Sequence, residues 1–186
     1  MDPLLELMIA WSLAALFAGS TLHKLLALSE WPGVVRNYRL IPDALAEVVS
    51  GVLLCAGALT AAALLWAPTH RIGASAAAIQ LIAYGAAMWI NVKRGRSSID
   101  CGCFGSRLRQ GISRWMVARN GVMAFAALTL LLPISRRELS AAEIGVCVGL
   151  VATLAFLYPV IAVVFQPSPP TYDENYLASA GPQGSR

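Results

Sequence analysis

The chain has 186 residues, of which 58% are apolar and only 13% are charged, and its formal net charge is +4. A soluble domain carries about 25% charged residues, so this composition excludes an ordinary soluble globular protein. The mean hydropathy of +0.65 and the long apolar runs instead indicate a polytopic membrane protein. We therefore expect lipid around most of the chain, and no nucleic-acid partner.

The expected fold class is all-α, a polytopic bundle of four to five transmembrane helices within residues 1–166. The tail, residues 167–186, is rich in Pro, Ser and Gly and is expected to be disordered. The first apolar stretch lacks the basic start and the cleavage site of a signal peptide, so we expect a retained helix. The five candidate helices cover residues 3–22, 44–66, 72–92, 115–132 and 143–165.

The first connection, Ser29 to Pro42, contains Trp31 and Tyr38. These residue types favour the level of the lipid headgroups, so the sequence predicts an interfacial elbow after the first helix. Pro42 and Asp43 then suit the first turn of a helix, because the Pro needs no amide donor there and the carboxylate meets the positive helix end.

The third candidate helix is rich in Ala and Gly, which allow helices to approach closely, so we expect it to be central in the bundle. The longest polar connection, residues 93–114, follows it. With five spanning helices, the first and third connections lie on the same side of the membrane. That parity places on one face the residues His23, Lys24, Arg36, Arg39, Glu47, Asp100, Cys101 and Cys103.

Cys101 and Cys103 are the candidate catalytic residues. Two cysteines one residue apart can form a disulfide only if the chain turns sharply, and Gly102 supplies the required backbone freedom. Such a small ring is strained, and strained disulfides tend to be the labile, catalytic ones. Asp100 before the pair and Arg107 or Arg109 after it are expected to tune the thiolate, since nearby cations lower the pKa of a thiol. Two unreactive loop thiols are the alternative interpretation.

A metal site is the second alternative, but zinc needs four ligands and only His23 is expected near the two cysteines. We therefore predict no metal. The remaining two cysteines, Cys55 and Cys147, are expected to differ in depth by about 8 Å, from the 1.5 Å helical rise and a core about 30 Å thick. That separation is too large for a disulfide, so we expect both to be buried packing residues.

Four further residues are candidate supporting residues: Lys24, Glu47, Arg119 and Asn120. An ionisable residue inside a membrane is a functional hypothesis by default. Lys24 could extend to the interface, or it could pair with Glu47 and join the first two helices. Arg119 and Asn120 could bind a quinone carbonyl, a lipid phosphate or Glu47, and the sequence leaves these alternatives open.

With these residues in place, the chain resembles the MauE family of methylamine utilisation proteins, within the wider MauE/DoxX-like set of redox-associated membrane proteins. The resemblance covers roughly residues 13 to 121. The stretch from Asp100 to Gly105, Asp-Cys-Gly-Cys-Phe-Gly, is its most specific part and includes Phe104. The other matching pieces are Phe17-x-x-x-Thr21-x-x-Lys24-Leu25, Tyr38-x-Leu40-Ile41-Pro42, Glu47 with Gly51, Asn91-x-x-Arg94-Gly95, Ile112-Ser113 and Arg119-Asn120.

The resemblance implies a role in making methylamine dehydrogenase, a periplasmic enzyme whose small subunit is dense in disulfides. The implied partners are that subunit and a thioredoxin-like protein similar to MauD. On this view Cys101 and Cys103 act as a thiol–disulfide oxidoreductase component, with quinone as the candidate electron acceptor. The alternatives are a non-catalytic membrane anchor or chaperone for the partner, and a DoxX-like subunit of a quinone-linked oxidoreductase.

The implied location is the bacterial cytoplasmic (inner) membrane, and the two signals for the side of the Cys loop disagree. Ten Lys and Arg residues fall on the Cys-loop side, against Arg71, Arg136 and Arg137 on the other. The positive-inside rule would place that side in the cytoplasm. Disulfides persist in the periplasm, and on the strength of the resemblance we expect the loop there.

Overall fold

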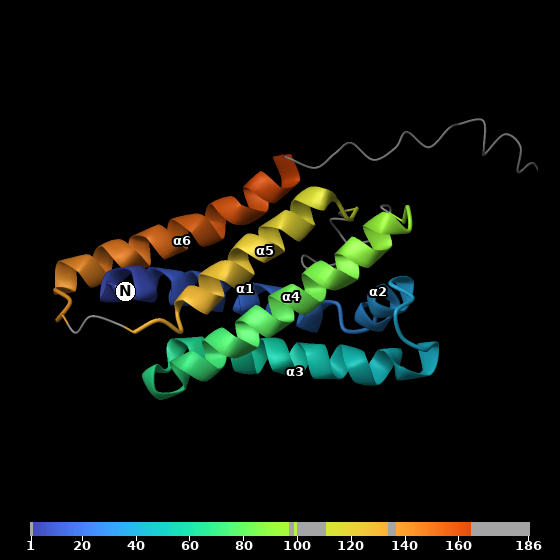
Figure 1. Cartoon of the computed structure of the whole chain (residues 1–186), viewed down its shortest axis with the longest axis horizontal. Coiled ribbons are helices and arrows are strands. Elements are labelled where there is room, and N and C mark those ends of the chain that lie inside the picture. Colours follow the sequence, from blue (N-terminus) through green and yellow to red (C-terminus); the bar gives the residue numbers. More distant parts are fainter. Residues whose placement is uncertain (1, 97–98, 100–110, 134–136, 165–186) are drawn as a thin grey trace, which may run out of the picture.

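The computed structural model describes residues 2–96, 99, 111–133 and 137–164, with side chains only up to residue 157 in the last range. The regular elements within these ranges are all helices, and they pack as an elongated bundle (Figure 1). The all-α prediction is therefore confirmed. The tail predicted to be disordered lies outside the described residues.

The described residues form six α-helices and two short 3-10 helices. In chain order they are α1 (Pro3–Leu26), α2 (Trp31–Asn37), η1 (Asp43–Leu45), α3 (Ala46–Leu65), η2 (Ala67–Thr69), α4 (His70–Lys93), α5 (Arg114–Thr129) and α6 (Ala141–Val164).

Three helical stretches in the described part of the chain are long and apolar enough to cross a membrane: Pro3–Leu26, Asp43–Leu65 and Ala67–Lys93. The 24-residue helix α6 joins them by length, and it is apolar over Ala141–Leu157. At 16 residues, α5 is shorter than the ~20 that span a bilayer. Of the predicted four to five spanning helices, four therefore agree better with the described residues.

Helix α1 starts where the sequence indicates but ends later than predicted. The Asp2 carboxylate accepts a hydrogen bond from the Leu4 amide (2.8 Å), and Pro3 occupies the first turn. The predicted end at Leu22 is wrong, because the helix continues to Leu26. The extra turn carries Lys24, which is buried in the bundle. Tertiary packing thus extends the helix past a Gly-Ser-Thr stretch that locally suggests an end.

The predicted elbow contains helix α2, and its two aromatic residues pack against the bundle. Trp31 is buried, and its indole Nε1–H donates to the Ser50 carbonyl of α3 at 3.1 Å. Tyr38 is half-buried against the residues that precede and begin α5. Both rings therefore fix α2 to the bundle. The interpretation as a headgroup anchor is wrong for Trp31, which is buried, and stays a prediction for the half-buried Tyr38.

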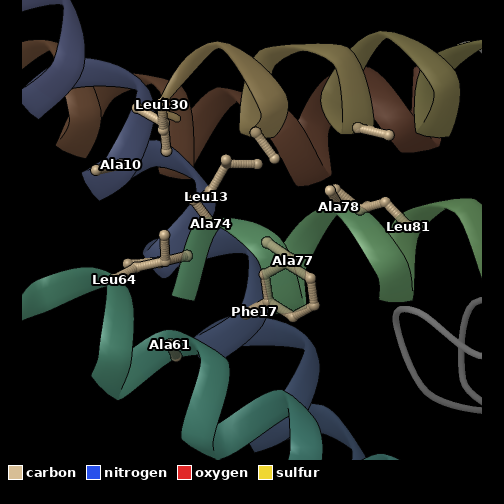
Figure 2. Packing of buried hydrophobic residues seen from close by; sticks show 13 residues of the cluster. Ala10, Leu13, Phe17, Ala61, Leu64, Ala74, Ala77, Ala78, Leu81 and Leu130 are labelled. Atoms are coloured by element: carbon tan, nitrogen blue, oxygen red, sulfur yellow. The ribbon is translucent and has the colours of Figure 1, made fainter. Parts of the chain in front are cut away.

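The main core forms where α1, α3, α4 and α5 meet (Figure 2). Small residues of α4 face it, and at Gly73 the α3 backbone comes so close that an added Cβ would lie 2.8 Å from Leu64 N. Helix α4 packs against α3 on one side and α5 on the other (Figure 1). The central position predicted for this Ala- and Gly-rich helix agrees with that arrangement.

Helix α6 lies along α1 at the edge of the bundle (Figure 1). A reciprocal capping box starts it: the Ser140 amide donates to the Glu143 carboxylate at 2.8 Å, and the Glu143 amide donates to the Ser140 hydroxyl at 3.3 Å. Arg137 adds an ion pair to Glu143 at 2.8 Å. Hydrogen bonds to Glu143 and then to Asp2 raise the pKa of Arg137 above its ordinary value.

The two cysteines outside the Cys-Gly-Cys stretch have different environments. Both are free thiols, as expected from their difference in depth. Cys147 is fully buried, which confirms its prediction as a packing residue, whereas Cys55 is exposed on α3. The prediction that Cys55 is buried is wrong, because α3 is apolar all round and its sequence does not mark which face turns inward.

Candidate functional site

One end of the bundle gathers the predicted site. There α1 and α4 end, α2 lies across the surface, and α3 and α5 begin (Figure 1). The arrangement agrees with the parity argument for the residues that the structure describes, among them Lys24, Arg36 and Glu47. We call this end the loop face.

Six of the predicted site residues belong to the Cys-Gly-Cys stretch and its flanks. Asp100, Cys101, Gly102, Cys103, Phe104 and Gly105 all lie outside the described residues. Their roles stay predictions. The structure does describe where the chain leaves the bundle before this stretch and where it returns.

The base of the Cys loop is held closed by a backbone hydrogen bond. The Ile112 amide donates to the Ile99 carbonyl at 3.2 Å. Both isoleucine side chains are buried with Met88 of α4 and Met116 of α5. This base is therefore packed against α4 and α5. Cys101 follows Ile99 by two residues in the sequence.

A second connection holds the preceding turn. Asn91, which is fully buried, donates from Nδ2 to the Ala87 carbonyl at 3.1 Å and accepts at Oδ1 from Arg96 Nη1 at 3.2 Å. Arg96 Nη2 also donates to the Asn37 carbonyl at the end of α2 (3.0 Å). Between them, Gly95 has a φ of +71°, a conformation that favours glycine. Asn91 and Gly95 belong to the pieces that carry the resemblance, whereas the contacts of Arg96 and Asn37 were not predicted.

Lys24 is buried at the loop face with an exposure of 6%. Its ammonium donates to the Tyr84 hydroxyl at 3.3 Å. The same nitrogen lies 4.7 Å from the centre of the Trp31 ring and 5.2 Å from that of Tyr84. Cation–π attraction of this kind is strongest where the cation is desolvated. Lys24 therefore joins α1, α2 and α4, and it does not extend to the membrane surface.

Glu47 has a different partner from the one considered in the sequence analysis. Its carboxylate accepts from Arg36 Nη2 at 3.1 Å, and both side chains are well exposed. Among the described residues, Glu47 forms neither the predicted pair with Lys24 nor the suggested contact with Arg119. The packing of α2 against α3 places Arg36 beside Glu47.

Arg119 and Asn120 line a cavity of about 600 Å³ that runs beside α1. Asn120 is buried, and its Nδ2 lies 3.5 Å from the Met88 sulfur. Arg119, the preceding residue of α5, is half-buried. Lys24, Tyr84, Arg119 and Asn120 thus meet at one end of a single cavity. Tyr84 and Trp31 are the residues that sequence reasoning missed here.

Hydrogen-bond donors, two of them cationic, are present at this end. An ammonium, a guanidinium and an amide line it, and the described lining residues include no carboxylate. Among the described residues no group of three or more His, Cys, Asp or Glu side chains could hold a metal ion. The cavity therefore suits a ligand that accepts hydrogen bonds, and that has a large apolar part.

The family described as methylamine utilisation protein MauE matches residues 1–133. A methylamine utilization protein MauE of Paracoccus denitrificans is 39% identical over 163 residues, covering 84% of this chain and 88% of that protein. The Paracoccus versutus protein of the same name is 44% identical over 73% of this chain and 74% of its own length.

A third relative, from Methylorubrum extorquens, is 35% identical over 72% of this chain and 73% of its own length, and has the same name. No solved structure gives a significant match. The matched region includes the loop face, the Cys-Gly-Cys stretch and the residues around Lys24. By the family match and by these identities, the chain belongs to the MauE family of methylamine utilisation proteins.

Proposed function

We propose that this membrane protein supports the maturation of methylamine dehydrogenase, and that Cys101 and Cys103 do so by thiol–disulfide exchange. Family membership supports the methylamine role. The observation that carries the exchange step is the closed base of the Cys loop, where Ile112 N–H donates to Ile99 O at 3.2 Å. A base that is fixed to α4 and α5 can present a short dithiol segment to a partner.

The exchange is balanced as two thiol displacements. A thiolate of a thioredoxin-like partner attacks the Cys101–Cys103 disulfide, which breaks the S–S bond and forms a mixed disulfide. The second partner thiol then displaces this chain, so the partner is oxidised and Cys101 and Cys103 leave as a dithiol. The oxidised partner transfers its disulfide to the small subunit of methylamine dehydrogenase in a second exchange of the same kind.

We propose the cytoplasmic membrane as the location, with the loop face in the periplasm, where disulfides persist. The charge of this face opposes that orientation. Three of its cations, however, have partners within the fold: Arg36 bonds to Glu47, Arg94 to the Arg39 carbonyl and Arg96 to Asn91 and Asn37. Their presence at this face thus has a structural reason besides topology.

Single and double Ser variants of Cys101 and Cys103 test the proposal, with Cys55→Ser as the matched control because Cys55 is an exposed thiol elsewhere. The readouts are the disulfide state of the small subunit, by alkylation and gel mobility, and the amount of this protein in the membrane. We expect maturation to fail in the Cys101 and Cys103 variants at unchanged membrane levels. Normal maturation in the double Ser variant would rule out exchange and favour a non-catalytic anchor for the partner.

A membrane-impermeant thiol reagent on intact cells, used before and after reduction, tests the orientation separately. Labelling of Cys101 and Cys103 only after reduction is the expected result, since the pair then faces the periplasm as a disulfide. Labelling that requires permeabilised cells would place the loop face in the cytoplasm and overturn this part of the proposal.

A further inference from the structure

The cavity beside α1 has the form of a site for a long lipophilic molecule. Its volume is about 600 Å³, within the range of small-molecule pockets. Lining residues on α1 extend from Leu5 to Lys24, about 28 Å at 1.5 Å per residue. The cavity therefore follows α1 through almost the whole hydrocarbon core, which is about 30 Å thick.

The cavity reaches the surface that faces lipid. Its walls come from α5 and α6, and two of the lining residues, Val122 on α5 and Leu154 on α6, are exposed, by 69% and 48%. Helix α6 rests on α1 while α5 rests on α4, so the cavity lies between two helices with different supports (Figure 1). A molecule dissolved in the bilayer can enter between them without crossing water.

The two ends of the cavity differ in chemistry. Toward the start of α1 the lining side chains are apolar, such as Leu5, Met8 and Ile9, whereas the loop-face end has Lys24, Tyr84, Arg119 and Asn120. Lys24 is held there by the Tyr84 hydroxyl and two aromatic rings. A ligand that fits both ends has hydrogen-bond acceptors at its head and an apolar tail.

The polar end extends over several levels of the bundle. Lys24 lies two residues before the end of α1, Arg119 five residues after the start of α5 and Tyr84 nine residues before the end of α4. These separations correspond to about 3 Å, about 8 Å and about 14 Å from the helix ends. A phospholipid phosphate at the headgroup level would reach Lys24 but not the two deeper donors. A neutral ring with two carbonyl oxygens can lie at their depth, and neighbouring cations favour the negative charge that its oxygens gain on reduction.

The polar end is also next to the base of the Cys loop. Asn120 lies 3.5 Å from the Met88 sulfur, and Met88 packs against Ile99 and Ile112. One buried side chain therefore separates a cavity-lining amide from the hydrogen-bonded base. The cavity and the base are parts of one packed unit.

We propose that this cavity binds a membrane quinone, with its ring at Lys24, Tyr84, Arg119 and Asn120 and its isoprenoid tail along α1. In its redox role this inference rests on the proposed function: oxidation of the Cys101/Cys103 dithiol to a disulfide releases two electrons and two protons, and these reduce the quinone to a quinol. Binding itself does not depend on the two thiols.

The test measures binding of decylubiquinone to the full-length protein in phosphatidylcholine nanodiscs, by quenching of tryptophan fluorescence. Lys24→Met removes the buried ammonium, and Lys93→Met is the matched control, because Lys93 stacks on Trp89 outside the cavity lining. We expect the dissociation constant to rise about tenfold for Lys24→Met, the usual size of one lost charged hydrogen bond, and to stay at the wild-type value for Lys93→Met.

A second variant guards against misfolding of Lys24→Met. Val122→Trp fills the cavity from an exposed position and is expected to weaken binding without changing thermal stability, with the equally exposed Val48→Trp on α3 as its control. Equal dissociation constants in all variants would overturn the site. Lys24-dependent binding of phosphatidylglycerol that excludes decylubiquinone would overturn the quinone and assign the cavity to an anionic lipid.

The double variant Cys101→Ser/Cys103→Ser separates this inference from the proposed function. We expect it to bind decylubiquinone as tightly as the wild type while failing in client maturation. Loss of binding in the double Ser variant would contradict a site formed by α1, α5 and α6. Normal maturation together with Lys24-dependent binding would refute the exchange proposal and leave the quinone site standing.

Discussion

The close approach of α3 and α4 at Gly73 makes a sharp prediction about stability. An added Cβ at this position would lie 2.8 Å from both Ala63 C and Leu64 N. These are backbone atoms, which cannot rotate away, so Gly73→Ala forces the two helices apart. Gly51 on α3 is the matched control, because an added Cβ there meets nothing within 4 Å.

Two opposing terms give the magnitude. Replacing Gly by Ala inside a helix gains about 1 kcal/mol from backbone propensity, and both variants receive that gain. Overpacking a close helix contact costs about 1–3 kcal/mol, and only Gly73→Ala has that cost. We therefore expect Gly51→Ala to be stabilised by up to about 1 kcal/mol and Gly73→Ala to unfold about 1–3 kcal/mol more easily than this control.

Thermal unfolding of the purified protein in one detergent, followed by circular dichroism at a helix wavelength, measures the difference. Gly57→Ala provides an intermediate case, because its Cβ would lie 2.9 Å from the Thr21 hydroxyl, a side-chain atom that can rotate. The expected order of melting temperatures is Gly51→Ala highest, then Gly57→Ala, then Gly73→Ala. Equal melting temperatures for the first and last variants would refute the contact between α3 and α4 at Gly73.

Two further predictions concern contacts at the loop face, and a third concerns the two cysteines on α3 and α6. Asn91→Leu should lower the free energy of unfolding by about 1–3 kcal/mol, because it leaves Ala87 O and Arg96 short of a buried partner; a melting temperature equal to that of the wild type would contradict this bridge. Glu47→Gln should change stability by less than about 1 kcal/mol, since its pair with Arg36 is exposed, and a larger loss in a denaturant titration would show that the pair is buried in solution. A lipid-soluble maleimide should label Cys55 and leave Cys147 unlabelled in the folded protein, as read by mass spectrometry of the intact chain, and the reverse pattern would show that α3 and α6 are rotated.

The helices could be predicted from the sequence because long apolar runs and Pro or Asp starts are local signals. The predicted starts of the second and third helices fall within two residues of η1 and α4. The end of α1 could not be predicted, because Thr21 and Lys24 stay helical through contacts with distant helices: Thr21 lies against Gly57, and Lys24 against Tyr84. No local pattern encodes these partners.

The partners within the site were harder to predict than its location. Parity alone brings Lys24, Glu47 and the Cys loop to one face, but the choice of partner depends on how each helix is rotated. Glu47 turned toward Arg36 and Lys24 toward two aromatic rings. A Trp residue occurs both at the level of the lipid headgroups and in buried contacts. The hydrogen bond of Trp31 to Ser50 could therefore not be inferred from the residue type.

One face of α4 organises the loop face, and its signal is present in the sequence. Tyr84, Met88 and Asn91 stand at i, i+4 and i+7, so they form one stripe of the helix. Along this stripe Tyr84 accepts from Lys24 of α1, the Met88 sulfur lies at Asn120 of α5, and Asn91 accepts from Arg96 before the Cys loop. The other inward positions of this helix are mostly Ala and Gly. Three larger side chains at this spacing, two of them polar, therefore indicate contacts with the residues around a site. The cavity, the buried ammonium and the base of the loop are therefore positioned by a single rigid element, so a rotation of α4 would disturb all three together.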